Sequence, residues 1–379
     1  MKKAVIWAVG VIAVIAIGMF VYLGKSDGKR ESIKIGAVLP LTGIMANYGI
    51  SLKQGIDLAV NEINSSGGIN GVPILVLYED SKSDAKIGVS AFNKLVSINN
   101  VPIVFGSLTS VILAIQPIAD EKQIVLINSS AISPNICEKA NKFLFSVMVN
   151  GATEAIFMAK DFQTKYPNEK LAILYSNNPS GVDTKDKLVS ELQFLGNTNV
   201  YAESYELNTT DFKSQIDKLK KSNAKYGYLL AFGSTEIASI LKQTKELNLN
   251  IQWFSHSGIE TRETLELAKD AANGVIYSYP KYNVSDTLYS RFQTEYQSKY
   301  NTWGDICAIT SYDGLYLIAD VMRKYGTSSF DIQNGLRSIY GFNGIFGGID
   351  FSKIGKQYVE RELFWKKIEN NRYEIINED

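Results

Sequence analysis

The sequence predicts an α/β fold with two successive assemblies of strands and helices, preceded by one N-terminal hydrophobic helix. Short apolar runs alternate with segments of helical periodicity along most of the chain from residue 33 onward. These runs are apolar throughout, as is typical of parallel strands that are covered on both faces. The alternation restarts after residue 150, which indicates two doubly wound parallel-sheet assemblies rather than one.

The first assembly contains four apolar runs that we interpret as strands, at residues 33–40, 74–78, 101–106 and 124–128. Between the first two, Leu52, Ile56 and Ile63 recur at helical spacing, and Gly67 and Gly68 follow as a natural helix stop. Ser83 and Asp84 are suited to cap the next helix, and Thr109 or Ser110 the one after it. This order of strands and helices is that of a doubly wound assembly.

The second assembly repeats the pattern. Strands are expected at residues 171–175, 200–205, 226–232, 251–254 and 274–279. Helices are expected at residues 153–166, 182–195, 211–222, 235–247 and 261–270. Two more helices, at 286–300 and 305–325, precede a strand-rich end with strands at 349–351, 358–368 and 372–376.

The N-terminus carries an uncharged apolar run, residues 4–23, with Lys2 and Lys3 before it. The run is long enough to cross a hydrocarbon core of about 30 Å. It therefore predicts either an uncleaved membrane anchor or a cleaved secretory signal, and both alternatives stay open. Residues 24–31 are polar and read as a short linker.

Composition excludes several classes of function. Among 379 residues, 39 Lys and Arg balance 39 Asp and Glu, so the basic excess of a nucleic-acid-binding protein is absent. A single His and two Cys exclude HExxH zinc sites and paired CxxC metal sites. Cys137 and Cys307 are expected to be free, without a His partner for nucleophilic catalysis. We therefore predict no cofactor, no metal and no enzymatic reaction.

A series of short motifs follows the chain in a fixed order. Pro40-Leu41-Thr42-Gly43 ends the first strand, Tyr48-Gly49 opens the first helix, and the motif AVNEINSSGGING runs from Ala59 to Gly71. The later motifs are GSLTS from Gly106, QPIA from Gln116, NSSAISP from Asn128 and GGIDF from Gly347. Together they cover nearly all of residues 32–379. In this order they resemble the extracytoplasmic solute-binding proteins of ABC transporters, of the branched-chain amino-acid (Leu/Ile/Val) type.

The resemblance implies a type I periplasmic-binding-protein fold with two lobes joined by a three-strand hinge. Lobe 1 would comprise residues 32–149 and 281–358, and lobe 2 residues 150–280 and 359–379, after a segment 1–31 that holds the anchor and linker. A small solute would bind between the lobes and pass to an ABC permease in the membrane. The protein would work outside the cytoplasm, tethered by its N-terminal helix. The alternative is a membrane-anchored sensory module with the same fold.

The resemblance also implies ligand-binding residues in lobe 1. A family Ser that bonds the ligand carboxylate corresponds to Ser110, beside Thr109, although a hydroxyl at a helix start is also an ordinary N-cap. Backbone groups are expected from Ser130 and Ala131. Ile132 stands where the family has a hydroxyl-bearing Thr, so one usual contact with an amino acid is missing. Tyr48 matches a ring that lines the ligand.

Lobe 2 departs further from the family. Ser180 and Gly233 stand at positions where aromatic residues are frequent, and Ser257 falls where an acidic residue pairs with the ligand ammonium. An unpaired buried ammonium costs several kcal/mol. Unless one of three other acids, Glu260, Glu236 or Asp183, replaces that partner, we expect an amide, a carboxylate or a small aromatic acid as ligand. His256 lies in the same loop and is a further candidate contact.

Overall fold

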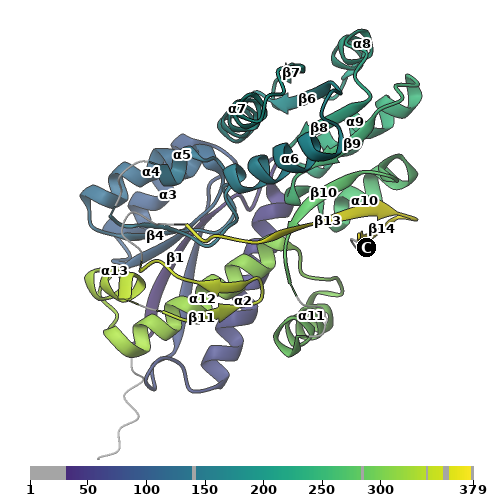
Figure 1. Ribbon diagram of the computed structural model, residues 1–379. Helices are drawn as coiled ribbons and strands as arrows, with labels where there is room; N and C mark the ends of the chain where they lie inside the picture. Colours follow the sequence, from purple (N-terminus) through teal and green to yellow (C-terminus); the bar gives the residue numbers. More distant parts are fainter. Residues whose placement is uncertain (1–30, 139–141, 283–285, 339, 353–357, 377–379) are drawn as a thin grey trace, which may run out of the picture.

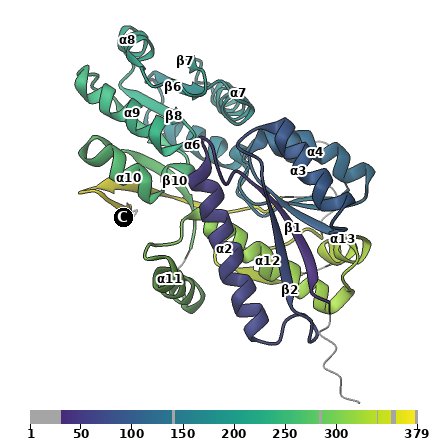
Figure 2. The same ribbon diagram turned by 180° about the vertical axis from the view of Figure 1, so that it is seen from behind.

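The computed structural model describes residues 31–138, 142–282, 286–338, 340–352 and 358–376 (Figures 1 and 2). Two sheets lie beside each other, each with its own helices. We call the five-stranded sheet with α2–α5 and α11–α13 the first half, and the seven-stranded sheet with α6–α10 the second half.

The first sheet is wholly parallel, in the order β2-β1-β3-β4-β5. Its strands are β1 (Ile33–Leu39), β2 (Ile74–Asp80), β3 (Ile103–Gly106), β4 (Val125–Asn128) and β5 (Leu144–Ser146). Its helices are α2 (Ala46–Ser65), α3 (Ala85–Ser97), α4 (Thr109–Glu121), α5 (Asn135–Glu138), α11 (Thr287–Tyr300), α12 (Ile306–Tyr325) and α13 (Ser329–Ser338).

Both faces of the first sheet are covered, which explains the apolar runs in its inner strands, whereas the edge strand β2 is less buried and ends in Glu79 and Asp80. Val38 and Val104 pack in one core with α3 and α4, whereas Ala37 and Phe105 pack in another with α2 and α12. Figure 2 shows the long helix α2 lying across its face of the sheet, while α3 and α4 cover the opposite face. The expected strands and helices of this half are present, with ends shifted by a few residues.

The second sheet has the order β14-β13-β10-β9-β8-β6-β7. Its strands are β6 (Leu171–Ser176), β7 (Val200–Tyr205), β8 (Tyr226–Leu230), β9 (Gln252–Ser255), β10 (Ile276–Pro280), β13 (Leu363–Glu369) and β14 (Arg372–Ile375). Its helices are α6 (Gly151–Lys165), α7 (Pro179–Phe194), α8 (Lys213–Lys221), α9 (Ser234–Glu246) and α10 (Arg262–Ala268), with the short 3₁₀ turns η1 (Ser257–Ile259) and η2 (Lys269–Ala272).

The second sheet corrects the prediction of parallel strands at one edge. β13 runs antiparallel to both β10 and β14. Asn370 and Asn371, both with positive φ, form the two-residue turn between β13 and β14, as a tight hairpin requires. The strand expected at residues 358–368 begins only at Leu363. β5, α5, α13 and β11 (Phe342–Gly344), which pairs with β12 (Gly347–Ile349), have no counterpart in the prediction.

The parallel strands of both sheets follow the same order. The first sheet reads β2-β1-β3-β4-β5, and the parallel part of the second reads β7-β6-β8-β9-β10. In each sheet the direction of winding reverses between its first and third strands along the chain, β1 and β3 or β6 and β8. Open α/β sheets bind ligands at such a switch point, outside the carboxyl ends of the strands. The fold therefore indicates one candidate ligand-binding edge in each half, at the carboxyl ends of the strands beside the switch point.

The chain crosses between the halves three times: after β5, after β10 and between β12 and β13. The described parts of these crossings are not continuous strands, contrary to the expected three-strand hinge. They are joined by a single bridge between Ser146 and Tyr358, where Val359 donates its N–H to the Ser146 carbonyl at 3.2 Å. Lys281 donates its N–H to the Glu362 carbonyl at 2.8 Å. The third crossing thus contacts both of the others.

The predicted anchor or signal, residues 4–23, lies outside the described residues. Within the described ranges, no helix is both long and apolar enough to span a membrane.

Candidate functional site

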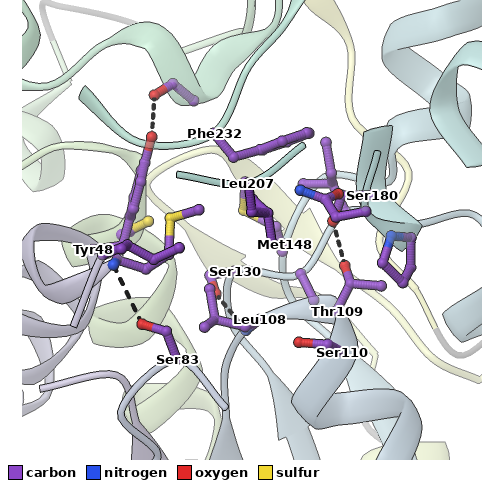
Figure 3. A pocket seen from close by; sticks show the side chains of 18 of the residues that line it. Tyr48, Ser83, Leu108, Thr109, Ser110, Ser130, Met148, Ser180, Leu207 and Phe232 are labelled. Carbon is purple, nitrogen blue, oxygen red and sulfur yellow. Dashed lines mark hydrogen bonds between the residues drawn. The ribbon is translucent and has the colours of Figure 1, made fainter. Parts of the chain in front are cut away.

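A cavity of about 250 Å³ lies between the two switch points (Figure 3). Its first-half residues are Ile44, Met45, Tyr48, Ser83, Leu108, Thr109, Ser110, Ser130, Ala131, Ile132, Met148, Ile306 and Cys307. Its second-half residues are Asn177, Asn178, Pro179, Ser180, Leu207, Phe232, His256 and Gly258. Within the described part of the chain, this lining includes no Asp, Glu, Lys or Arg.

The start of α4 forms one polar part of the wall. Leu108 precedes the helix with φ of 64° and donates its N–H to the Ser130 hydroxyl at 3.4 Å, and no side chain caps the helix. Ser130 is held in turn by the Ser107 hydroxyl at 2.9 Å. The first N–H groups of a helix have no partner within the helix and carry partial positive charge. The N-terminus of α4, with Thr109 and Ser110, is therefore suited to an anion.

The start of α7 forms the facing wall from the second half. Asn178 caps this helix by accepting from the Gly181 N–H at 2.9 Å, and Pro179 occupies its first position. This cap places Ser180 opposite Thr109, whose hydroxyl lies 2.6 Å from that of Ser180. Unlike α4, α7 has a side-chain cap, so its first turn is less available to a ligand.

The loop after β9 closes another side. His256 is 2 % exposed, and both of its ring nitrogens have backbone partners. Nδ1 accepts from the Gly258 N–H at 3.1 Å, and Nε2 lies 3.0 Å from the Ala231 carbonyl, which assigns the proton to Nε2. The imidazole packs against Phe232 with 4.8 Å between ring centres. His256 therefore presents ring surface to the cavity rather than a free nitrogen.

The three acids considered as partners for a ligand ammonium are all engaged elsewhere. Glu260 pairs with Lys366, with 2.5 Å between Nζ and Oε2. Glu236 accepts from the Tyr205 hydroxyl at 3.2 Å, and burial raises the pKa of Glu236 to about 7. Asp183 accepts a hydrogen bond from Ser133 across the cleft. None of the three lines the cavity.

The structure brings eight of the ten predicted site residues to the cavity: Tyr48, Thr109, Ser110, Ser130, Ala131, Ile132, Ser180 and His256. Gly233 and Ser257 do not line it. Gly233 directly precedes α9, and Ser257 is fully buried behind the wall, where its N–H donates to Glu154 Oε1 at 2.8 Å. Whether the eight contact a ligand remains a prediction.

Sequence reasoning missed several lining residues. Met45, Leu108 and Asn178 each directly precede a helix that follows a parallel strand, so the switch-point rule would have found them. Met148, Leu207 and Cys307 carry no such signal. Cys307 is buried and free, and burial raises the pKa of its thiol well above the usual range. The side chain of Cys137 lies outside the described residues.

Among the described residues, five side-chain hydrogen bonds join the two halves directly at the edges of this site, one of them from the Gly233 N–H to the Tyr48 hydroxyl at 3.4 Å. Asn47 donates to the Ser234 hydroxyl at 2.9 Å, and Tyr48 donates to the Gly258 carbonyl at 3.0 Å. The other two are Thr109 with Ser180 and Ser133 with Asp183. The halves therefore meet in a closed arrangement around the cavity.

Two sheets of matching order on either side of a small cavity are the arrangement of a two-lobed binding protein. The chain belongs to the periplasmic binding protein family, whose sequence profile matches residues 32–369. It is 26% identical over 385 residues to "Leu/Ile/Val-binding protein homolog 2" of Brucella abortus (strain 2308). The alignment covers 98% of this chain and 99% of that protein.

Two solved structures share the fold. One is the substrate-binding protein of a branched-chain amino acid transporter from Streptococcus pneumoniae, in complex with isoleucine (TM-score 0.82, 22% identity, 91% of this chain and 99% of that one). The other is an ABC-transporter solute-binding protein from Rhodopseudomonas palustris in complex with 3,4-dihydroxy benzoic acid. It has a TM-score of 0.81 and 19% identity, and the match covers 91% of this chain and 96% of that one. These identities show the fold alone. Family membership implies an extracytoplasmic protein that serves ABC transport by binding.

Proposed function

We propose that this protein captures a small, largely apolar monocarboxylate between its two lobes and delivers it to an ABC importer. The observation that carries this proposal is the charge of the cavity wall. Its described residues include no acidic side chain that would pair with an ammonium, while the uncapped start of α4 offers N–H groups and hydroxyls to an anion.

The remainder of the cavity favours an aliphatic or aromatic body on the ligand. Met45, Ile132, Met148, Leu207 and Phe232 are among its non-polar lining residues. Burying a carbon skeleton against these side chains is favourable by about 25 cal/mol per Å² of apolar surface. An aromatic acid bound by the Rhodopseudomonas palustris protein fits this description, and the isoleucine bound by the Streptococcus pneumoniae protein carries an ammonium that would have no charged partner here.

The lobes in this proposal are residues 32–149 with 281–358, and residues 150–280 with 359–379. Bending at the three crossings would separate the α4 wall from the α7 wall, admit the solute, and close again on it. Among the predicted contacts, Thr109, Ser110, Ser130 and Ala131 would hold the carboxylate. Ile132, Tyr48, Ser180 and His256 would line the body of the ligand.

The experiment uses ligand pairs that differ by one charge. Leucine and isocaproate share a carbon skeleton and differ only in the ammonium, and benzoate and benzamide differ in the carboxylate charge. We expect isocaproate and benzoate to raise the thermal unfolding temperature, because a ligand that binds the folded state stabilises it. Leucine should bind at least about a hundredfold more weakly than isocaproate, since an unpaired buried charge costs several kcal/mol. Tighter binding of leucine than of isocaproate would contradict the proposal.

The tether and the delivery step are parts of the same proposal. An uncleaved segment 4–23 would keep the receptor beside its permease, whereas a cleaved signal would release it. Membrane fractionation and N-terminal sequencing of the mature protein distinguish the two. A sensory module with this fold would bind the same solute without supporting its uptake. Loss of radiolabelled solute uptake after gene deletion, restored by the intact gene, would support transport.

A further inference from the structure

The Tyr48 side chain reaches from the first half to the second half at one end of the cavity. It belongs to the first turn of α2, is 9% exposed, and donates its hydroxyl proton to the Gly258 carbonyl at 3.0 Å. The same oxygen accepts from the Gly233 N–H at 3.4 Å. Figure 3 shows Tyr48 on the side of the cavity opposite Thr109 and Ser180, with Met148, Leu207 and Phe232 between them.

The two partners of Tyr48 form a specific pair of polar groups. Gly233 precedes α9 with φ of 110°, no side chain caps that helix, and the Gly233 N–H is directed to the Tyr48 hydroxyl. Gly258 lies in the η1 turn and offers a carbonyl. A donor beside an acceptor is satisfied by a hydroxyl, which both accepts and donates. An ammonium has only donors and an ionised carboxylate only acceptors, so neither would satisfy both groups.

We propose that Tyr48 is a specificity-determining residue. Its phenol hydroxyl occupies a position in the cavity wall, between the Gly233 N–H and the Gly258 carbonyl, that would otherwise bind a hydroxyl of the ligand. The inference rests on the proposed carboxylate binding at α4 and names the ligand more narrowly. The solute has one polar end, its carboxylate, and an apolar far end that packs against the Tyr48 ring. A solute with a hydroxyl at the far end would have to displace the Tyr48 hydroxyl from Gly233 and Gly258.

The phenol is well suited to hold this position. Burial raises the pKa of Tyr48 above its usual range, so the hydroxyl keeps its proton and remains a donor to Gly258. Tyr48 lines the cavity, and the next residue, Gly49, lies so close to the Pro40 carbonyl that a side chain there would clash with it. The backbone that carries Tyr48 is thereby fixed in place.

The test compares one pair of acids on three forms of the full-length protein. The pair is hydrocinnamate and its para-hydroxy derivative, and the forms are wild type, Tyr48→Phe and Tyr48→Ala. The readout is the ratio of the two dissociation constants from calorimetry, because a general loss of closure weakens both acids and leaves the ratio unchanged. Circular dichroism and the unfolding temperature check that each variant is folded.

We expect wild type to bind hydrocinnamate at least about tenfold more tightly than the para-hydroxy acid, since the buried hydroxyl has no free partner. Tyr48→Phe keeps the ring in place and should keep this preference, with both acids bound more weakly. Tyr48→Ala opens the position to the ligand, and the preference should invert to about tenfold in favour of the para-hydroxy acid.

An equal ratio in wild type and Tyr48→Ala would overturn the inference while carboxylate binding at α4 stands. If wild type binds no carboxylate, the proposed function fails. Phenol, which carries a hydroxyl but no carboxylate, then tests whether the site of the Tyr48 hydroxyl binds a hydroxyl group. Phenol should raise the unfolding temperature of Tyr48→Ala more than that of wild type, and benzene should not show this difference. An equal response of both forms to phenol would overturn the inference in that case.

Discussion

The hydroxyls of Thr109 and Ser180 lie 2.6 Å apart across the cleft, one at the start of α4 and the other at the start of α7. Each belongs to a different half of the molecule. Their hydrogen bond forms only when the two helix starts face each other, so it contributes to closure and not to the folding of either half.

Removing this hydrogen bond should shift the protein toward an open arrangement. We expect Thr109→Val and Ser180→Ala each to weaken closure by about 1 kcal/mol, the typical net value of one hydrogen bond. The double variant should be no weaker than either single one, because both remove the same interaction. Spin labels at the exposed positions Ile87 and Phe194, with Cys137 replaced, would report the distance between the halves. Additive effects of the two substitutions would show that the hydroxyls act independently.

Glu154 should stabilise the second half through the loop that carries His256. The Glu154 carboxylate is fully buried and accepts from the Ser257 N–H at 2.8 Å and from the Ser278 hydroxyl at 3.0 Å. Glu154→Ala should lower the free energy of unfolding by about 3 kcal/mol, because it leaves a buried N–H without a partner. Glu154→Gln keeps an acceptor and should lose about half as much. Urea unfolding measures both, with the half-exposed Glu169→Ala as the control.

The buried pair of Lys366 and Glu260 should behave asymmetrically on substitution. Lys366 is 3% exposed, lies 4.6 Å from the Tyr279 ring centre, and shares Glu260 with the Tyr277 hydroxyl at 2.5 Å. Lys366→Met should destabilise the fold by about 3–5 kcal/mol, since it leaves a buried carboxylate unpaired. Adding Glu260→Gln to Lys366→Met should recover much of this loss. A double variant less stable than Lys366→Met alone would contradict the argument.

The stability of the second half should rise as the pH falls from 8 to 5.5. Burial raises the pKa of Glu236 to about 7 in the folded protein, above the usual value of about 4.3. The folded state therefore binds a proton in a pH range where the unfolded state does not, and stability is lost as the pH rises toward and through 7. The gain on acidification should be about 2 kcal/mol. Glu236→Gln should reduce this gain, and an unchanged pH profile would contradict the assignment.

The sequence predicted the parallel core of both sheets because continuous apolar runs are a local signal. It failed at the C-terminus, where the pairing of β13 with β10 joins residues far apart in the chain. The ends of strands β1, β3, β6 and β8 could be located from the same signal, and they carry most of the cavity wall. The position of Ser257 could not, because its burial depends on the distant Glu154.

The interaction partners of Glu260, Glu236 and Asp183 could not be predicted from the sequence either. Each acid lies close in the chain to a cleft segment, and only the three-dimensional partners show that none faces the cavity. The absence of a family acid at Ser257 was, in contrast, visible from the motif alone. The residue type at Ser257 can be read from the sequence, whereas the partners of Glu260, Glu236 and Asp183 depend on tertiary packing.

The five direct side-chain hydrogen bonds between the halves at the cavity have a kinetic consequence. A solute in the cavity leaves only after these bonds open together, so the lifetime of the complex depends on the frequency of opening. Substitutions at Asn47 or Ser133 would therefore shorten the residence time of the solute while leaving its rate of encounter nearly unchanged. In the proposed delivery to an ABC importer, the membrane partner would accelerate release by contacting both halves and holding them apart, without touching the solute.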